Sequence, residues 1–217
     1  EGRRRWERRF VTPEMFQRIV KDYYRLISGM DREVGRIVEA LGERADNTVI
    51  VFMSDNGYIL GERGMADKWL PYEESIRVPL IVLDPRATAT RGRKVDAMAL
   101  NIDVAPTLLD EAGLSVPVGM QGRSLVPLVR SGNAPTGWRT EFFYEHLALP
   151  DRIPPTEAVR TEKWKYFRWM SGKPPIEELY DLRADPREEH NLAGDPTHAA
   201  TLKELRDKWS KWREQVK

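Results

Sequence analysis

The sequence predicts an α/β fold that is followed by a small antiparallel sheet and a terminal helix. Three patterns carry this prediction: a long amphipathic helix, two short apolar strands after it, and a series of short alternating segments in the last third. A helix that precedes two buried strands is typical of a layered α/β sheet. Because the pattern changes at Trp138, we expect one domain over residues 1–137 and a small α+β subdomain over residues 138–217.

The first predicted helix begins after a basic arm. Five arginines lie between residues 3 and 9, and we interpret this arm as a solvated linker rather than as a binding patch. Thr12-Pro13-Glu14 then predicts a helix start, because Thr suits the N-cap, Pro the first helical position and Glu the positive helix end. Apolar residues recur at helical spacing from Phe16 to Leu41, so we expect one buried face and an end at Gly42.

The rest of the first domain follows from local patterns. Apolar runs at residues 48–53 and 78–83 predict buried strands of a layered sheet. Residues 101–112 predict a helix whose start is reset by Pro106. We expect a loop at 115–122, and a short helical turn after it at 124–129.

The last third predicts a small antiparallel sheet and a helix. Short alternating or aromatic segments lie at residues 141–146, 158–160, 165–169 and 178–181. Residues 197–217 predict an amphipathic helix, whose apolar stripe we interpret as a packing face. The stripe consists of Leu202, Leu205, Trp209 and Trp212.

The composition excludes several classes of function. A net charge of +1 over 217 residues argues against a protein organised around nucleic acid or an anionic membrane. Zero cysteines exclude disulfides, thiolate metal sites and a cysteine nucleophile within the chain. No apolar run approaches the roughly 20 residues that span a bilayer. We therefore expect neither nucleic acid nor a membrane as a partner. Since the chain begins with neither an initiator Met nor an apolar signal core, we expect it to be a piece of a longer protein.

The stretch Ser54-Asp55-Asn56-Gly57 directly follows the first predicted strand, where open α/β sheets bind ligands. Carboxylate and amide oxygens suit Ca²⁺ or Mg²⁺ rather than a thiophilic metal. Gly57 permits a sharp turn that would let both preceding side chains reach one ion. The same tripeptide is also a common turn, so the residues alone leave both interpretations open.

Lys68 is a second candidate for the same site. Gly61 and Gly64 let the chain fold back, so this lysine can return to the end of the same strand. Because an ammonium group near a divalent ion is repelled unless an anion lies between them, the pair predicts an oxyanion site. The alternative is an exposed lysine on a loop.

A series of motifs extends over nearly the whole chain. They are Ser54-Asp55-Asn56-Gly57-Tyr58, Gly61-Glu62-x-Gly64, Asp67-Lys68, Pro71-Tyr72-Glu73-Glu74-Ser75, Asp103-x-x-Pro106-Thr107, Gln121-Gly122-Arg123-Ser124-Leu125, Val159-Arg160-Thr161-x-Lys163-x-Lys165, Glu178-Leu179-Tyr180-Asp181 and Glu189-x-Asn191-Leu192. In this order they resemble the second half of the type I, formylglycine-dependent sulfatases of the alkaline phosphatase superfamily. The resemblance implies that residues 1–137 are part of the large sulfatase α/β sheet domain. Within the family, the pattern resembles bacterial sulfatases that act on sulfated glycans.

The resemblance implies a sulfuric ester hydrolase in which a hydrated formylglycine attacks sulfur while Ca²⁺ holds the sulfate. It implies that Asp55 and Asn56 are calcium ligands and that Lys68 is catalytic, in contact with the sulfate and the leaving oxygen. We also expect His146 to contact the substrate. Arg63 stands where many relatives carry His, and we expect it to bind an anionic sugar.

Two parts of the family pattern are absent. The chain has no cysteine and no Ser-x-Pro-x-Arg, so we expect the formylglycine, and the paired aspartates that complete the calcium site, in a preceding half. We expect the fragment alone to be inactive. For the parent protein we expect a sulfated small molecule or glycan as substrate, export to the periplasm or cell exterior, and oligomerisation through an exposed sheet edge.

Two alternatives to a sulfatase stay open. The first is a phosphodiesterase or phosphonate hydrolase of the same superfamily, although such two-metal relatives usually carry Asp-His at positions 55–56 and more downstream histidines. The second is a folded binding module without catalysis.

Overall fold

The structure is a computed structural model that describes residues 1–216, and its chain divides into two units. Unit 1 comprises residues 1–22, 56–78 and the chain from 141 onward, and unit 2 comprises residues 23–55 and 79–140. Each unit therefore combines segments that are distant in sequence. The predicted domain boundary between residues 137 and 138 stays a prediction.

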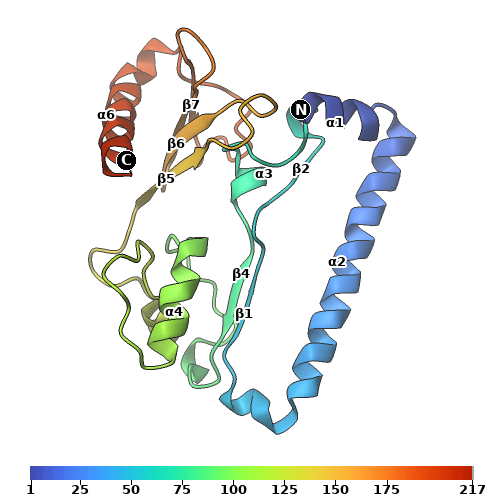
Figure 1. The fold of residues 1–217 in the computed structure, drawn as a ribbon, viewed down its shortest axis with the longest axis vertical. Coiled ribbons are helices and arrows are strands. Elements are labelled where there is room, and N and C mark those ends of the chain that lie inside the picture. The colour runs from blue at the N-terminus through green and yellow to red at the C-terminus, as the bar shows by residue number, and fades with distance from the viewer. Residues whose placement is uncertain (217) are drawn as a thin grey trace. The chain divides into compact units, whose positions relative to one another are not determined.

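The core of unit 1 is a four-stranded antiparallel sheet in the order β5-β6-β7-β8, with helix α6 packed against it (Figure 1). These elements are β5 (Glu141–His146), β6 (Thr156–Thr161), β7 (Trp164–Trp169), β8 (Ile176–Asp181), the 3₁₀ turn Pro196–His198 and α6 (Ala199–Gln215). The predicted antiparallel sheet and terminal helix are therefore confirmed. Lys217, which the prediction placed in the helix, lies outside the described residues.

Strand β7 shows how the sheet supports the rest of unit 1. Tyr166 and Phe167 are both fully buried, and side chains that follow one another in a strand point to opposite faces. Tyr166 packs with Leu205 of α6. Phe167 packs with Ile59 and Tyr72, and its ring centroid lies 5.3 Å from that of Tyr72. The second face of the sheet is thus covered by segment 56–78.

Segment 56–78 folds back on itself over a short two-stranded ladder. Strand β2 (Ile59–Leu60) pairs antiparallel with β3 (Ala66–Asp67), with the 3₁₀ turn Glu62–Gly64 between them. Gly61 and Gly64 have φ angles of +115° and +61°, which residues with a Cβ rarely adopt. The reversal that the two glycines predict is confirmed. Helix α3 (Glu73–Ile76) completes the segment.

The N-terminal arm is a helix, so its interpretation as a solvated linker was wrong. Helix α1 spans Gly2–Arg9 and contacts strand β3. Arginine is a good helix former, and pairs four residues apart, such as Glu1 with Arg5 at 3.0 Å, add support. Arg5 and Arg9 also form ion pairs with Asp67, whose side chain is only 7% exposed. A charge run is solvated only when no buried opposite charge lies within reach.

Helix α2 (Pro13–Leu41) begins and ends as predicted. The backbone N–H of Met15 donates to Thr12 Oγ1 at 3.2 Å, and Gly42 follows the last helical residue with a φ of +51°. The predicted buried face is wrong, because none of the residues of α2, all of them described, is buried. Helical periodicity predicts which residues form the apolar stripe, but it does not predict that another element covers the stripe. The exposed stripe includes Phe16, Tyr23, Leu26, Ile27, Met30, Ile37 and Val38.

Unit 2 contains the two predicted strands. Strand β1 (Ile50–Met53) pairs antiparallel with β4 (Leu80–Leu83) in a two-stranded ladder, with Ile50 opposite Leu83 (Figure 1). Their positions are confirmed, but Ile81 is 61% exposed, so the expected full burial was wrong. Leu83, which lies on the same face of β4 as Ile81, is 41% exposed, so this face of the strand is not covered.

The remaining elements of unit 2 are short helices. They are the 3₁₀ turns Gly42–Asn47, Thr88–Thr90 and Asn101–Asp103, helix α4 (Val104–Glu111) and helix α5 (Val126–Ser131). Helix α4 starts two residues before Pro106, which confirms the predicted reset. In the part of the chain that the structure describes, no helix combines the length and the apolar character of a membrane span.

Asp84, directly after β4, is the centre of a charge cluster in unit 2. Its side chain is fully buried, with Arg86 Nε at 2.8 Å and Arg130 Nε at 3.5 Å from its carboxylate oxygens. Burial alone would raise the pKa of Asp84, but the bonds from Arg86 and Arg130 outweigh it and hold the pKa below its ordinary value.

We expect Asp84 to contribute stability that is lost in acid. Because its folded-state pKa lies below the ordinary value of 3.8, the contribution is full at neutral pH and disappears as the pH falls through the folded-state pKa. Asp84→Asn should therefore reduce the loss of unfolding free energy between about pH 5 and about pH 2, measured by urea titration. Asp96→Asn is the control, since Asp96 is 85% exposed beside Lys94. Equal acid losses in wild type and Asp84→Asn contradict this account.

Candidate functional site

The candidate site lies in unit 1, where the reversal of segment 56–78 brings Asn56 and Lys68 together. Asn56 precedes strand β2 and Lys68 directly follows strand β3. Lys68 Nζ donates a hydrogen bond to Asn56 Oδ1 at 2.9 Å, and both side chains are partly buried. The structure thus joins two of the residues that the sequence proposed for one site.

The orientation of the Asn56 amide is fixed from both ends. Its Nδ2 donates to the carbonyl oxygen of Gly57 at 2.8 Å, which directs Oδ1 toward Lys68. Asn56 Oδ1 therefore accepts from the Lys68 ammonium group in a fixed direction. Asp55 belongs to unit 2, where its exposed side chain follows β1. A carboxylate and an amide oxygen are donors that fit a hard divalent cation such as Ca²⁺.

The backbone on both sides of Lys68 is strained. Asp67 has a φ of +94° and Trp69 a φ of +80°, although both carry a Cβ. Such conformations cost of the order of 1–3 kcal/mol each and persist only where neighbouring contacts hold them. The Tyr144 hydroxyl donates to the Trp69 carbonyl at 3.0 Å, and burial raises the pKa of Tyr144 to about 12, so this hydroxyl keeps its proton. Residues of this kind concentrate at functional sites.

The backbone at Gly57, next to Asn56, packs closely against helix α3. Its backbone N–H donates to the carbonyl oxygen of Ser75 at 2.8 Å. A Cβ at this position would lie 2.1 Å from the carbonyl oxygen of Glu74, a distance that backbone atoms do not tolerate. Only glycine therefore allows the chain beside Asn56 to lie against α3.

We expect Gly57→Ala to destabilise the protein by about 1–3 kcal/mol, because the added methyl group must push two backbone segments apart. The measurement is the free energy of unfolding in urea. Gly29→Ala in α2 is the matched control, since a Cβ there meets nothing within 4 Å. That substitution should be neutral or stabilising by about 0.5–1 kcal/mol. If Gly57→Ala is as stable as wild type, the close packing of this turn is refuted.

A buried ionic network lies under helix α3. Lys165 of strand β7 is fully buried, and its Nζ lies 2.7 Å from Glu73 Oε1 and 2.8 Å from Glu188 Oε1. The other carboxylate oxygen of Glu188 accepts from the backbone N–H of Glu73 at 2.7 Å. The network therefore fixes the first residue of α3, the helix on which Gly57 packs.

The two carboxylates of this network have pKa values that shift in opposite directions. For Glu73, burial acts to raise the pKa, but Lys165 and Arg160 outweigh it, so the pKa lies below its ordinary value. For Glu188, burial raises the pKa and Lys165 does not fully offset it. Sequence analysis missed the network. The available signal was a lysine within a strand that is otherwise largely aromatic.

Arg63 and His146 lie in different surroundings. Arg63 forms an ion pair with Glu74 at 2.9 Å, and its guanidinium carbon lies 4.0 Å from the ring centroid of Tyr72. His146 is the last residue of strand β5, opposite Thr156, and no described residue bonds its buried Nδ1. Their contact with a substrate stays a prediction.

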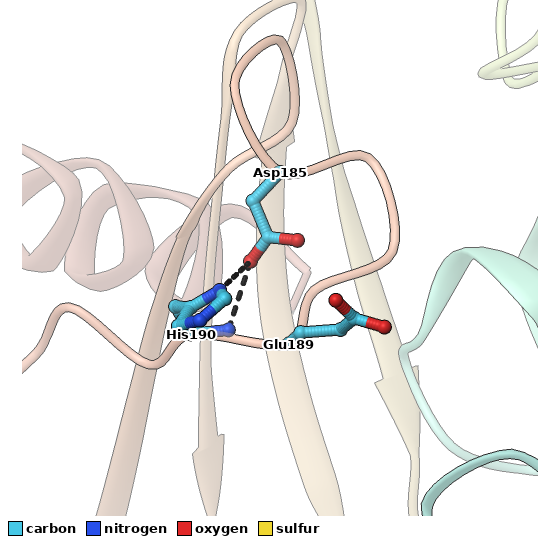
Figure 2. A group of neighbouring side chains, drawn as sticks. All are labelled: Asp185, Glu189 and His190. Atoms are coloured by element: carbon cyan, nitrogen blue, oxygen red, sulfur yellow. Dashed lines mark hydrogen bonds and ion pairs between the residues drawn. The ribbon is translucent and has the colours of Figure 1, made fainter.

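A second polar group lies on the loop after β8. Figure 2 shows Asp185 directed at His190, with the Glu189 carboxylate extending the other way. Asp185 Oδ2 accepts from the backbone N–H of His190 at 2.8 Å and lies 3.7 Å from its ring Nδ1. The His190 side chain is 78% exposed. These contacts stabilise the loop and leave the His190 ring at the surface.

Two protein-family models match the chain. The model described as "N-sulphoglucosamine sulphohydrolase, C-terminal" matches residues 61–215, and the model described as "Sulfatase" matches residues 3–114. Each match covers half of the chain or more.

Individual proteins are similar over most of the chain. An N-acetylglucosamine-6-O-sulfatase of Bacteroides thetaiotaomicron is 37% identical over 196 residues, which are 88% of this chain and 35% of that protein. A solved structure, in complex with its substrate D-glucosamine-2-N,6-O-disulfate, is 35% identical with a TM-score of 0.86, over 93% of this chain and 41% of that one. The phosphonate monoester hydrolase of Agrobacterium radiobacter is 31% identical with a TM-score of 0.82, over 94% and 43%. The chain thus spans less than half the length of each relative.

Proposed function

Because this chain belongs to the sulfatase family, we propose that it is the C-terminal portion of a calcium-dependent sulfatase that hydrolyses sulfate esters. The observation that carries the proposal is the bond between Lys68 Nζ and Asn56 Oδ1 at 2.9 Å. It supports the proposal because an ammonium group beside a metal-ligand oxygen suits an anion that both the lysine and a cation can hold.

The proposed roles follow from the charges of these side chains. Lys68 binds an oxygen of the sulfate group and supplies positive charge where negative charge develops on the leaving oxygen. Asn56 and Asp55, adjacent in sequence, offer oxygen ligands to the calcium ion. A bound Ca²⁺ supplies Lewis-acid stabilisation of the sulfate oxygens. The chain contains no cysteine and no Ser-x-Pro-x-Arg, so the proposal takes the formylglycine from another part of the parent protein.

We further propose a sulfated amino sugar or glycan as the substrate. The proposal is supported by the similarity to an N-acetylglucosamine-6-O-sulfatase and to a structure with a disulfated glucosamine as its substrate. Arg63 and His146 are the proposed contacts with the sugar. Export of the parent protein to the periplasm or cell exterior is part of the same proposal, because sulfated glycans are extracellular.

The phosphonate monoester hydrolase is the observation that favours a second candidate. It would make the parent protein a hydrolase of phosphonate or phosphate esters. Asn56 separates the two candidates, since the two-metal relatives are expected to carry His at this position.

The test compares ester classes on the full-length protein. We expect 4-nitrophenyl sulfate and glucosamine 6-sulfate to be hydrolysed faster than a phenyl phosphonate monoester. A calcium-selective chelator should abolish activity, and Ca²⁺ should restore it better than Mg²⁺. Calorimetry should detect Ca²⁺ binding that Asp55→Asn weakens. Faster hydrolysis of the phosphonate, without any effect of the chelator, would establish the second candidate instead.

A further inference from the structure

Lys68 occupies a turn that is unfavourable without outside contacts. Its two neighbours, Asp67 and Trp69, have φ angles of +94° and +80°. Both conformations bring the Cβ close to backbone atoms, and a released turn would return to the common regions of φ and ψ. The Lys68 side chain would then move away from Asn56. Contacts that hold Asp67 and Trp69 therefore also hold Lys68.

One side chain contacts both neighbours. Arg5 Nη1 of helix α1 donates to Asp67 Oδ2, and the Arg5 guanidinium carbon lies 4.8 Å from the centroid of the Trp69 ring. A guanidinium group can do this because its edge donates hydrogen bonds while its face stacks on an aromatic ring. Lysine offers no such plane.

Helix α1 is itself fixed against the site segment. Arg9, four residues after Arg5 and therefore on the same face of the helix, lies 3.5 Å from Asp67 Oδ2 and also donates to the Tyr58 hydroxyl. Glu1 accepts from Arg5 Nε at 3.0 Å and fixes the other edge of the guanidinium group. Contacts other than the one with Asp67 therefore also fix the position of Arg5.

We propose that Arg5 is a positioning residue for Lys68, and that it acts through Asp67 and Trp69. An effect of Arg5 on catalysis rests on the proposed function of Lys68. The positioning of the lysine can be tested without that function, because the position of an amine can be measured in the absence of turnover.

The first measurement is the accessibility of Lys68 in the full-length protein. We expect Arg5→Ala to increase acetylation of Lys68 Nζ by acetic anhydride about tenfold, measured by mass spectrometry of peptides. On a sulfate ester, kcat should fall about tenfold to a hundredfold while KM changes little, because a misplaced catalytic group costs this much. Arg8→Ala is the control, since Arg8 is exposed on the same helix. It should leave labelling and kcat unchanged.

Asp67→Gly separates positioning from stability. Glycine adopts a positive φ without strain, so the melting temperature should stay close to that of wild type. Glycine also removes the strain at position 67 that the Arg5 contact offsets, so labelling of Lys68 should stay below that of Arg5→Ala. Adding Arg5→Ala to Asp67→Gly should therefore raise labelling and lower kcat by less than Arg5→Ala does in wild type.

The outcomes distinguish the two proposals. Unchanged labelling of Lys68 in folded Arg5→Ala overturns the positioning role, whatever the activity. An effect of Arg5→Ala in the Asp67→Gly background that is as large as its effect in wild type overturns it as well. A wild-type protein that hydrolyses no sulfate ester, but whose Lys68 becomes accessible in Arg5→Ala, contradicts the proposed function and supports the positioning role.

Discussion

Lys68→Ala is expected to reduce kcat for a sulfate ester by about a hundredfold to a thousandfold in the full-length protein. The reason is the loss of a fixed positive charge beside the oxygen on which negative charge develops. Stability should change by only about 1 kcal/mol, since the substitution removes one partly buried hydrogen bond to Asn56. The measurement is kcat for two esters whose leaving groups differ in pKa. The loss should be larger for the ester with the more basic leaving group, which depends more on the lysine.

Two comparisons make this result specific. Lys203→Ala removes a lysine whose side chain is 78% exposed, where it pairs with Asp207, and should leave kcat unchanged. Lys68→Arg keeps the charge but not the compact ammonium geometry, and should recover only part of the activity. Equal losses for the two esters would show that Lys68 does not act on the leaving oxygen.

The second large effect concerns stability. We expect Lys165→Met to lower the free energy of unfolding by about 3–5 kcal/mol, because it leaves two buried carboxylates without their shared counter-ion. Glu73 and Glu188 both lie within 2.8 Å of the lysine, and Glu188 is fully buried. The measurement is a urea titration at neutral pH.

The control is a double variant. Lys165→Met/Glu188→Gln removes the second charge and should recover part of the lost stability. The pH dependence provides a further check on the sign. Burial already raises the pKa of Glu188, so its folded form binds a proton more readily than its unfolded form. Without Lys165 this preference grows, and the stability of Lys165→Met should rise as the pH is lowered from 7 to about 5. A parallel pH dependence in wild type and variant would contradict the shared counter-ion.

Local patterns account for the parts that the sequence predicted well. The alternation in residues 141–181 places Tyr166 and Phe167 on opposite faces, and the structure has both faces covered. Gly61 and Gly64 predict the chain reversal that brings Lys68 within hydrogen-bond distance of Asn56. In each case the decisive information lies within a few residues of the feature.

Long-range contacts account for the parts that were missed. Glu188 binds the backbone of Glu73, which is 115 residues away, and composition does not indicate such a pair. The arginines of α1 resemble a solvated arm until Asp67 is known to be buried beside them. The positive φ angles on both sides of Lys68 have no sequence signal either, because neither Asp67 nor Trp69 is a glycine.

The discontinuity of unit 1 determines the order in which the site assembles during synthesis. The chain leaves the ribosome from its N-terminus, so Arg5 of helix α1 and Asp67, which are 62 residues apart, can meet while β7 is still untranslated. The Lys165 network must wait for residue 188, and contacts across such long loops form slowly. A nascent chain therefore acquires the arginine contacts around Lys68 first and the ionic support under helix α3 last.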